Sequence, residues 1–247
     1  AEALGGNPCL EQTLESYELC CLVECFPDKH LRGHLEGQEE DKGGARLTAE
    51  GEAAAREAFE RTLRSALLYA KSVSLGPLHW APSNRVTLRN RRLGVSLSGI
   101  QQFVARADGA LGGGGGGHGP GLEVLRQWCE SGYAELRRFD HELSERFAVP
   151  PSIKLTSVKP SGTVSLLAGA TPGLHWPEAR YYIRRIRMPR GVAYADGSLD
   201  DAALLLRRLA EAGYPVELAV GDEEKTAVVS VPVAIGNPAA GAEGGAE

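Results

Sequence analysis

Two stretches of the chain place apolar side chains at the three- and four-residue spacing of an amphipathic helix. The first should begin after Thr48, a good N-cap residue with Glu50 and Glu52 behind it, and end at Gly76-Pro77. The second covers residues 122–147 and stops at Pro150-Pro151. Cys129 should lie in the core, and the apolar stripe consists of Leu122, Leu125, Cys129, Leu136, Phe139, Leu143 and Phe147.

A third helix is expected over residues 85–107. Small residues at Gly94, Ser98 and Gly99 would let this helix pack closely against a neighbour. Arg91 and Arg92 would then be solvated charges on its surface, because arginine is rarely buried without a partner.

Alternation of apolar and polar residues predicts strands in the second half, over 153–158, 181–188, 216–220 and 226–233. Ser198, with Asp201 three residues later, has the spacing of a capping box and should open a helix that ends at Gly213. Helices and strands therefore alternate, which is typical of the α/β class.

The remaining segments are polar or rich in glycine. Residues 28–47 should form a surface loop, and residues 108–121, with six consecutive glycines, a flexible insertion between helices. The composition from Asn237 onward predicts a disordered tail over 237–247. We therefore expect one domain over residues 1–236.

Composition excludes several classes of protein. The formal net charge of −5 over 247 residues gives no electrostatic reason for nucleic-acid or membrane-surface binding. No apolar run is long enough to cross a bilayer, and no secretory signal is visible. The chain has no initiator Met, so we expect a fragment from which targeting signals could have been lost, and we predict a cytoplasmic location.

Four of the five cysteines lie within seventeen residues, namely Cys9, Cys20, Cys21 and Cys25, with Cys129 apart from them. This odd number does not suggest a disulfide scaffold and fits reactive thiols in a reducing compartment. A zinc site is the competing interpretation, since His30 and His34 follow the cluster at an acceptable spacing. The cysteine half of such a site is poor, so no metal is predicted.

The stretch Asn7-Pro8-Cys9-Leu10-Glu11 carries the chemistry. Pro8 disfavours helix at Asn7, and in an extended chain Asn7, Cys9 and Glu11 would share one face. A thiol can be a nucleophile, a metal ligand, a redox partner or a hydrogen-atom donor. The carboxylate can act as a base and the amide can orient a hydroxyl, so the trio suits a polyhydroxylated substrate. A buried, inert cysteine remains the alternative from these residues alone.

A second candidate site follows the strand expected at 153–158. It contains Ser161, Gly162, Thr163, Val164 and Ser165 behind Pro160. Glycine allows a ligand to approach the backbone, and hydroxyl and N–H groups at a turn can bind an anion. The sequence therefore predicts a phosphate site here, with an ordinary Pro-Ser-Gly turn as the alternative.

Together these motifs resemble the ribonucleotide reductases. In that family an Asn-Pro-Cys-x-Glu motif carries the radical cysteine and a catalytic glutamate, and a cysteine eleven residues later belongs to a reducing dithiol. Asn7, Cys9, Glu11 and Cys20 match these positions. The Arg-Arg-Leu-Gly segment at Arg91 and the Pro-Ser-Gly-Thr loop are also similar. The run 171–175, Thr-Pro-Gly-Leu-His, resembles the adenosylcobalamin-dependent triphosphate reductases.

The resemblance implies a fold, a cofactor and partners. The fold would be part of a ten-stranded α/β barrel with the cysteine on a central finger loop. Cys9 would carry a thiyl radical generated with adenosylcobalamin, Glu11 would take the 3′-hydroxyl proton, and Asn7 would bind the substrate. A ribonucleoside triphosphate would be reduced to its 2′-deoxy form for DNA synthesis, with its phosphates at residues 161–165. Cys20 would supply electrons and be re-reduced by thioredoxin or a similar dithiol.

Alternatives remain open at this point. The chain could come from the large subunit of a metallo-cofactor-dependent reductase, in which a tyrosine pair relays the radical. Tyr181-Tyr182 invites that interpretation but follows the phosphate loop too closely. The chain could also be an inactive nucleotide-binding fragment, and we expect the isolated 247 residues not to turn over.

Overall fold

The computed structural model describes residues 3–36, 45–112, 119–175, 179, 181–194 and 197–234. They fall into two compact units, one up to residue 175 and the other from residue 179, within the single domain expected over 1–236. The tail expected at 237–247 lies outside the described residues, as does the centre, 113–118, of the insertion expected at 108–121. Within the described residues, no helix combines the length and apolarity needed to cross a membrane.

The first unit is built on a parallel pair of strands, β3 (Cys21–Cys25) and β4 (Leu93–Leu97), in register from Cys21↔Leu93 to Cys25↔Leu97. The crossover between them contains α1 (Pro27–Arg32), α2 (Ala49–Leu75) and α3 (Ala81–Asn90). Residues 153–157 run along the other edge of β4, where Val95 N donates to Leu155 O at 2.8 Å. Of the strand expected at 153–158, only one bridge, Val95↔Thr156, forms. Mixed helices and strands confirm the α/β class.

The prediction of one long helix over 85–107 is wrong. The segment divides into α3, β4 and α4 (Ile100–Ala110), and Arg91 with φ 48° ends α3. Large apolar residues at 93, 95 and 97 alternate with small residues at 94 and 96. This period of two is typical of a strand. Gly94 is needed for close approach, because an added Cβ would lie 2.4 Å from Leu22 Cδ2.

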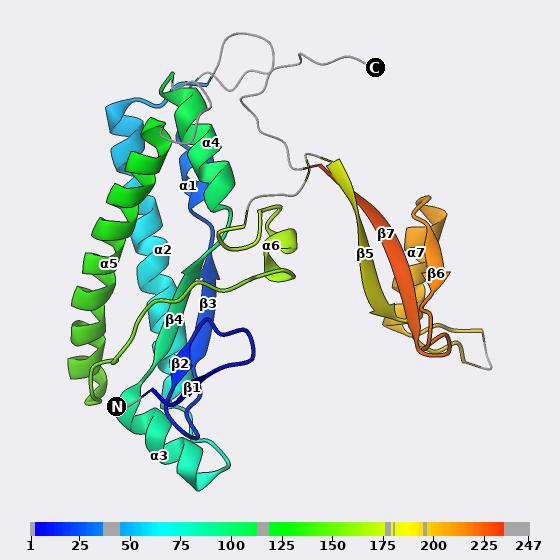
Figure 1. The fold of residues 1–247 in the computed structure, drawn as a ribbon, viewed down its shortest axis with the longest axis horizontal. Coiled ribbons are helices and arrows are strands. Elements are labelled where there is room, and N and C mark those ends of the chain that lie inside the picture. Colours follow the sequence, from blue (N-terminus) through cyan, green and yellow to red (C-terminus); the bar gives the residue numbers. More distant parts are fainter. Residues whose placement is uncertain are drawn as a thin grey trace. The chain divides into compact units, whose positions relative to one another are not determined.

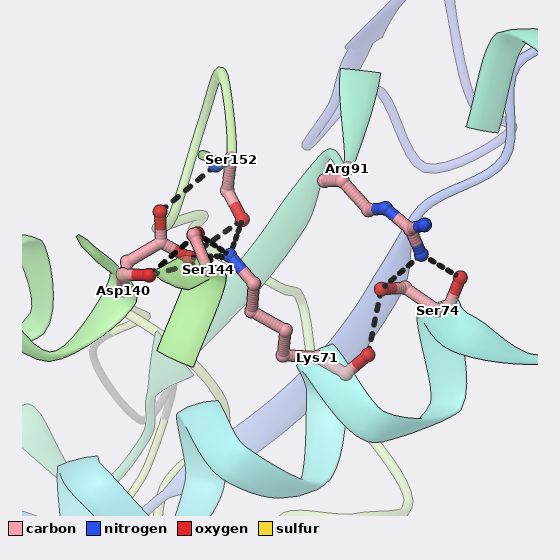
Figure 2. Close-up of polar contacts among 6 residues, drawn as sticks. All are labelled: Lys71, Ser74, Arg91, Asp140, Ser144 and Ser152. Atoms are coloured by element: carbon pink, nitrogen blue, oxygen red, sulfur yellow. Dashed lines mark hydrogen bonds and ion pairs between the residues drawn. The ribbon is translucent and has the colours of Figure 1, made fainter. Parts of the chain in front are cut away.

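Arg91 and Arg92 are buried, at 5% and 7% exposure, and are not the solvated charges expected from the sequence. The Arg91 guanidinium donates to the carbonyl oxygen of Ser74 at the end of α2 (Figure 2). Arg92 Nε lies 2.9 Å from the Glu18 carboxylate. Both arginines are tolerated because an acceptor is buried with each of them.

Two long helices, α2 and α5 (Pro120–Phe147), lie side by side along the strand pair (Figure 1). The cap of α2 is confirmed, since Gly51 N donates to Thr48 Oγ1 at 3.1 Å. On α5, Trp128 lies in the core and stacks on Phe59, whereas the next residue, Cys129, is exposed. Consecutive helical residues point about 100° apart, so burial of Trp128 turns Cys129 outward and the prediction that it lies in the core is wrong.

The prediction of a surface loop over 28–47 is also partly wrong, because the first residues of this segment form α1. Asp28 and Leu31 are buried there, and Arg106 Nε of α4 donates to Asp28 Oδ1 at 2.7 Å. Pro27 at the first turn suits a helix start. A polar sequence therefore encodes a helix whose one carboxylate is paired inside the unit.

A buried polar cluster joins α2 to the C-terminal end of α5 (Figure 2). Lys71 Nζ, with no exposed surface, lies 2.5 Å from Asp140 Oδ1 and 2.5 Å from Ser144 Oγ. Asp140 also accepts from the backbone N–H of Ser152 at 2.8 Å. Burial lowers the pKa of Lys71, and the bond to Asp140 opposes that shift. The cluster thus fixes the start of the segment that runs along β4.

The second unit is a small antiparallel sheet in the order β5-β7-β6, with α7 beside it. Its elements are β5 (Tyr181–Pro189), α7 (Asp201–Glu211), β6 (Val216–Leu218) and β7 (Thr226–Ala234). The strands occur where the sequence predicts them. The cap of α7 is Asp200, which accepts from Ala203 N at 2.8 Å, and not Ser198 as expected. Leu206, Ala227 and Val229 form the small core of this unit.

We predict that Lys71→Met lowers the free energy of unfolding of the chain by about 3–5 kcal/mol, because it leaves the Asp140 charge buried and unpaired. Arg61→Met on the same helix is the matched control. Arg61 pairs with Glu57 at 2.7 Å in an exposed ion pair, and its loss should cost at most about 0.5 kcal/mol. Urea denaturation measures both, and equal effects of the two substitutions would contradict a structural role for the buried pair.

Candidate active site

The motif at residues 7–11 forms a tight turn and not the extended segment expected from the sequence. Strands β1 (Gly5–Gly6) and β2 (Thr13–Leu14) pair antiparallel on either side of it. Leu10 N donates to Asn7 O at 2.9 Å, and Leu10 has φ 60°. Because the flanking strands pair, the six residues between them must reverse direction. The common face expected for Asn7, Cys9 and Glu11 is therefore lost.

The turn places its thiol and its carboxyl in different surroundings. Cys9 is exposed and free, near the exposed side chain of Leu10. Glu11 is partly buried, and its Oε2 is a buried atom without a hydrogen-bond partner among the described residues. An unsatisfied buried carboxylate oxygen is costly, so it indicates a place where a donor group from a ligand can bind.

Asn7 has a role within the turn itself. Its Oδ1 accepts from Gln12 N at 3.1 Å, and its backbone N donates to Gln12 O at 3.1 Å. These bonds close the turn through the acceptor oxygen of the amide. The Nδ2 donors of Asn7 are not used in them, so the side chain can still donate to a substrate hydroxyl.

Two bonds that the sequence does not predict tie the turn to β4 and to the segment that runs along it. Gln12, fully buried, donates from Nε2 to Leu93 O at 3.0 Å. Ser157 donates from Oγ to Glu11 O at 2.7 Å. No local pattern marks either residue, because the partners are far apart in the chain. A cavity of about 720 Å³ opens beside Glu11, lined mainly by apolar side chains of α2, β4 and α5 and also by Ser157 and Leu174.

Cys20 is half-buried and lies within electrostatic reach of Glu11. Burial raises the pKa of its thiol, and the charges of Glu11, Cys21 and Glu18 raise it further, while Arg92 opposes them. Glu18 positions this segment, since it also accepts from Asn90 Nδ2 at 2.9 Å. The structure thus brings Cys20 near Glu11. In the described part of the chain, no three His, Cys, Asp or Glu side chains gather as a metal site.

The second motif forms a turn that leads into α6 (Val164–Leu167). Ser161 has φ 50°, and Ser165 N donates to Ser161 O at 3.2 Å. Gly162 and Thr163 form the turn, and Val164 begins the helix. The hydroxyl oxygens of Ser161, Ser165 and the nearby Thr171 are buried, and none has a hydrogen-bond partner among the described residues. Three such hydroxyls near one turn fit a site that accepts an anion from outside the chain.

Residues after α6 are held against the start of α4, where Gln102 makes two bonds that sequence reasoning missed. Its Nε2 donates to Gly169 O at 3.1 Å, and its Oε1 accepts from Thr171 N at 2.9 Å. Gly99 N donates to Thr171 O at 2.8 Å. The loop that carries the phosphate motif therefore lies beyond the carboxyl end of β4, the usual place for a ligand in an α/β sheet.

Two curated reductases are similar to this chain over most of its length. The chain is 49% identical over 234 residues to the adenosylcobalamin-dependent ribonucleoside-triphosphate reductase of Euglena gracilis, covering 95% of this chain and 26% of the relative. It is 46% identical over 231 residues to a probable enzyme of the same description from Dictyostelium discoideum, covering 94% and 24%. No protein-family model matches the chain.

A crystal structure of a B12-dependent, class II ribonucleotide reductase matches the fold with a TM-score of 0.62 at 27% identity. That match covers 94% of this chain and 29% of the solved one. The chain is a homologue of the adenosylcobalamin-dependent ribonucleotide reductases. The resemblance stated from the sequence motifs is confirmed, and this reductase homologue spans about a quarter of the length of the curated relatives it matches.

We predict that Glu11→Gln lowers the pKa of Cys20, because it removes a negative charge that disfavours the thiolate. In a Cys21→Ser background, alkylation of Cys20 by iodoacetamide at pH 8 should become faster, as measured by mass spectrometry of the derived peptides. Cys129 provides an internal control, because the charge of Glu11 does not contribute to the pKa of its thiol. An unchanged rate at Cys20 would contradict the proximity of the two groups.

Proposed function

We propose that the chain forms the part of an adenosylcobalamin-dependent ribonucleoside-triphosphate reductase that carries its radical cysteine and its substrate-phosphate loop. The product would be a 2′-deoxyribonucleoside triphosphate for DNA synthesis. The observation that supports this most is the turn at residues 7–12, with an exposed free thiol and a carboxylate oxygen that lacks a partner. The curated relatives that match nearly the whole chain are named for this activity.

Cys9 is the hydrogen-atom carrier in this proposal. A free, exposed thiol on a turn fits the approach of a cofactor that generates radicals, and adenosylcobalamin supplies that radical when it is bound. Cys9 as a thiyl radical removes the 3′ hydrogen of the ribose. Glu11 accepts the 3′-hydroxyl proton through its unpartnered oxygen, and Asn7 donates from Nδ2 to the substrate.

Cys20 belongs to the reducing dithiol. Reduction of one ribonucleotide converts two thiols to a disulfide and releases one water. Cys20 must therefore pair with a second cysteine, which is not Cys9. Its raised pKa keeps the thiol protonated near neutral pH, which suits a hydrogen donor more than a nucleophile. Thioredoxin or a similar dithiol would restore the pair, in the cytoplasm, and no nucleic-acid or membrane partner is proposed.

The substrate's triphosphate would bind at residues 161–165. The buried hydroxyls of Ser161 and Ser165 would donate to phosphate oxygens, together with backbone N–H groups of the turn. The parallel pair β3 and β4 would be two of ten strands in a barrel, with the turn at Cys9 as its central finger loop. Such a barrel would close the radical site to solvent.

The test is nucleotide reduction by the complete protein that contains this segment. With CTP, a dithiol and adenosylcobalamin, we expect deoxy-CTP to form, and omission of the cofactor should abolish it. CDP in place of CTP tests the preference for triphosphates. Reduction that ignores adenosylcobalamin and requires a metallo-cofactor subunit would replace this proposal by the class I alternative. Absence of reduction under either condition would favour an inactive nucleotide-binding fragment.

A further inference from the structure

Two serines of one strand hold the two ends of the phosphate loop. Ser96 Oγ accepts from Lys159 N at 2.8 Å, just before the motif at 161–165. Ser98 Oγ accepts from Gly173 N at 2.9 Å, just after the loop. Both serines are fully buried. They are two residues apart at the end of β4, so they bring both ends of the loop to within about 7 Å along the strand.

A single carboxylate orients both serines. Glu24 lies opposite Ser96 in the parallel register of β3 and β4. Its Oε1 accepts from Ser98 Oγ at 2.5 Å and from Ser96 Oγ at 3.2 Å. A backbone N–H can only donate, so each serine oxygen must accept from the loop and turn its own hydrogen toward Glu24. The direction of every bond in the network therefore requires an acceptor at position 24.

The charge of Glu24 does not explain its place beside an anion site, because a carboxylate repels a phosphate through space. The acceptor capacity of Glu24 does explain its place. If an apolar side chain replaced Glu24, the two buried serine hydroxyls would have no acceptor for their hydrogens. Gly173 also allows no substitute, because its φ is 50° and an added Cβ would lie 2.5 Å from Lys159 O. The two ends of the loop thus meet directly at this tether.

We propose that Glu24 is a positioning residue for the substrate's phosphates, acting through Ser96 and Ser98 on both ends of the loop over residues 159–173. This deepens the proposed function and rests on its assignment of the phosphate site. Glu24 touches neither substrate nor radical in this proposal. Its substitution should therefore loosen the loop and weaken binding of the triphosphate.

The tether itself is tested on the 247-residue chain, without any assumption about activity, by hydrogen exchange at the backbone amides of Lys159 and Gly173. Glu24→Leu should speed exchange at both by at least about tenfold, the loss expected for a hydrogen bond to a charged group. Glu24→Gln keeps an acceptor oxygen and should stay near the wild-type rates. Glu52→Leu is the matched control, because Glu52 accepts from Trp128 Nε1 of α5 at 2.6 Å and not from Ser96 or Ser98.

Two serine variants keep the test decisive if Glu24→Leu fails to fold. Ser96→Ala should speed exchange at Lys159 alone, and Ser98→Ala at Gly173 alone. Exchange that stays at wild-type rates in folded Glu24→Leu, or in both serine variants, would overturn the tether.

The link to substrate is tested by titration of CTP into the complete protein. Glu24→Leu should raise the dissociation constant about tenfold, whereas Glu24→Gln should not. The effects of Glu24→Leu and Ser98→Ala on the dissociation constant should be non-additive, because both substitutions remove the hydrogen bond between Ser98 and Glu24. Faster exchange with unchanged affinity would overturn the positioning role. Failure of the wild-type protein to bind CTP would instead refute the proposed function, and the exchange experiment would still decide the tether.

Discussion

The site depends on one short strand that presents different side chains to its two sides. In β4, Leu93, Val95 and Leu97 pack against the helices, while Gly94 and Ser96, with Ser98 just beyond the strand, face the turn at Cys9 and the loop over residues 159–173. The parallel register with β3 fixes this division, since a shift of one residue would exchange the two sides. Both the turn at Cys9 and the phosphate loop are held by hydrogen bonds to this strand or its continuation.

Buried polar groups in the first unit fall into two kinds. Lys71, Asp140 and Ser152 satisfy one another, so these groups stabilise one arrangement of α2, α5 and the segment that follows α5. Glu11, Ser161 and Ser165 instead bury atoms that no described group satisfies. Unsatisfied atoms also occur outside the motifs, for example at Thr87 and Gln101, but Glu11, Ser161 and Ser165 lie in the two segments whose motifs match the reductases.

The sequence predicts those parts of the fold that local periodicity determines. The helices α2 and α5 and the strands β5 and β7 occur where expected, because their patterns are long and regular. The helix predicted over 85–107 is wrong, because a five-residue strand is short compared with the window over which a helical pattern is recognised. Burial of Arg91 could not be foreseen, since its acceptor comes from the end of α2.

The candidate site divides in the same way. Its chemical residues follow from motifs, since Asn7, Cys9, Glu11 and Cys20 stand at a spacing shared with a family. Their geometry does not, because the turn is closed by pairing of β1 with β2 and fixed by partners far away in the sequence, such as Gln12 with Leu93 and Ser157 with Glu11. Glu24 could not be selected from the sequence at all, because its role depends on two strands and both ends of a loop.

Substitution of the Cys9 sulfur tests most directly whether Cys9 carries the radical. In the complete protein with adenosylcobalamin, a dithiol and CTP, Cys9→Ser should reduce formation of deoxy-CTP to background, because a serine hydroxyl does not replace a thiol as a hydrogen-atom carrier. Cys129→Ser, an exposed cysteine on α5, is the matched control and should retain activity. Reduction by the Cys9→Ser variant at a rate close to that of Cys129→Ser would contradict the account.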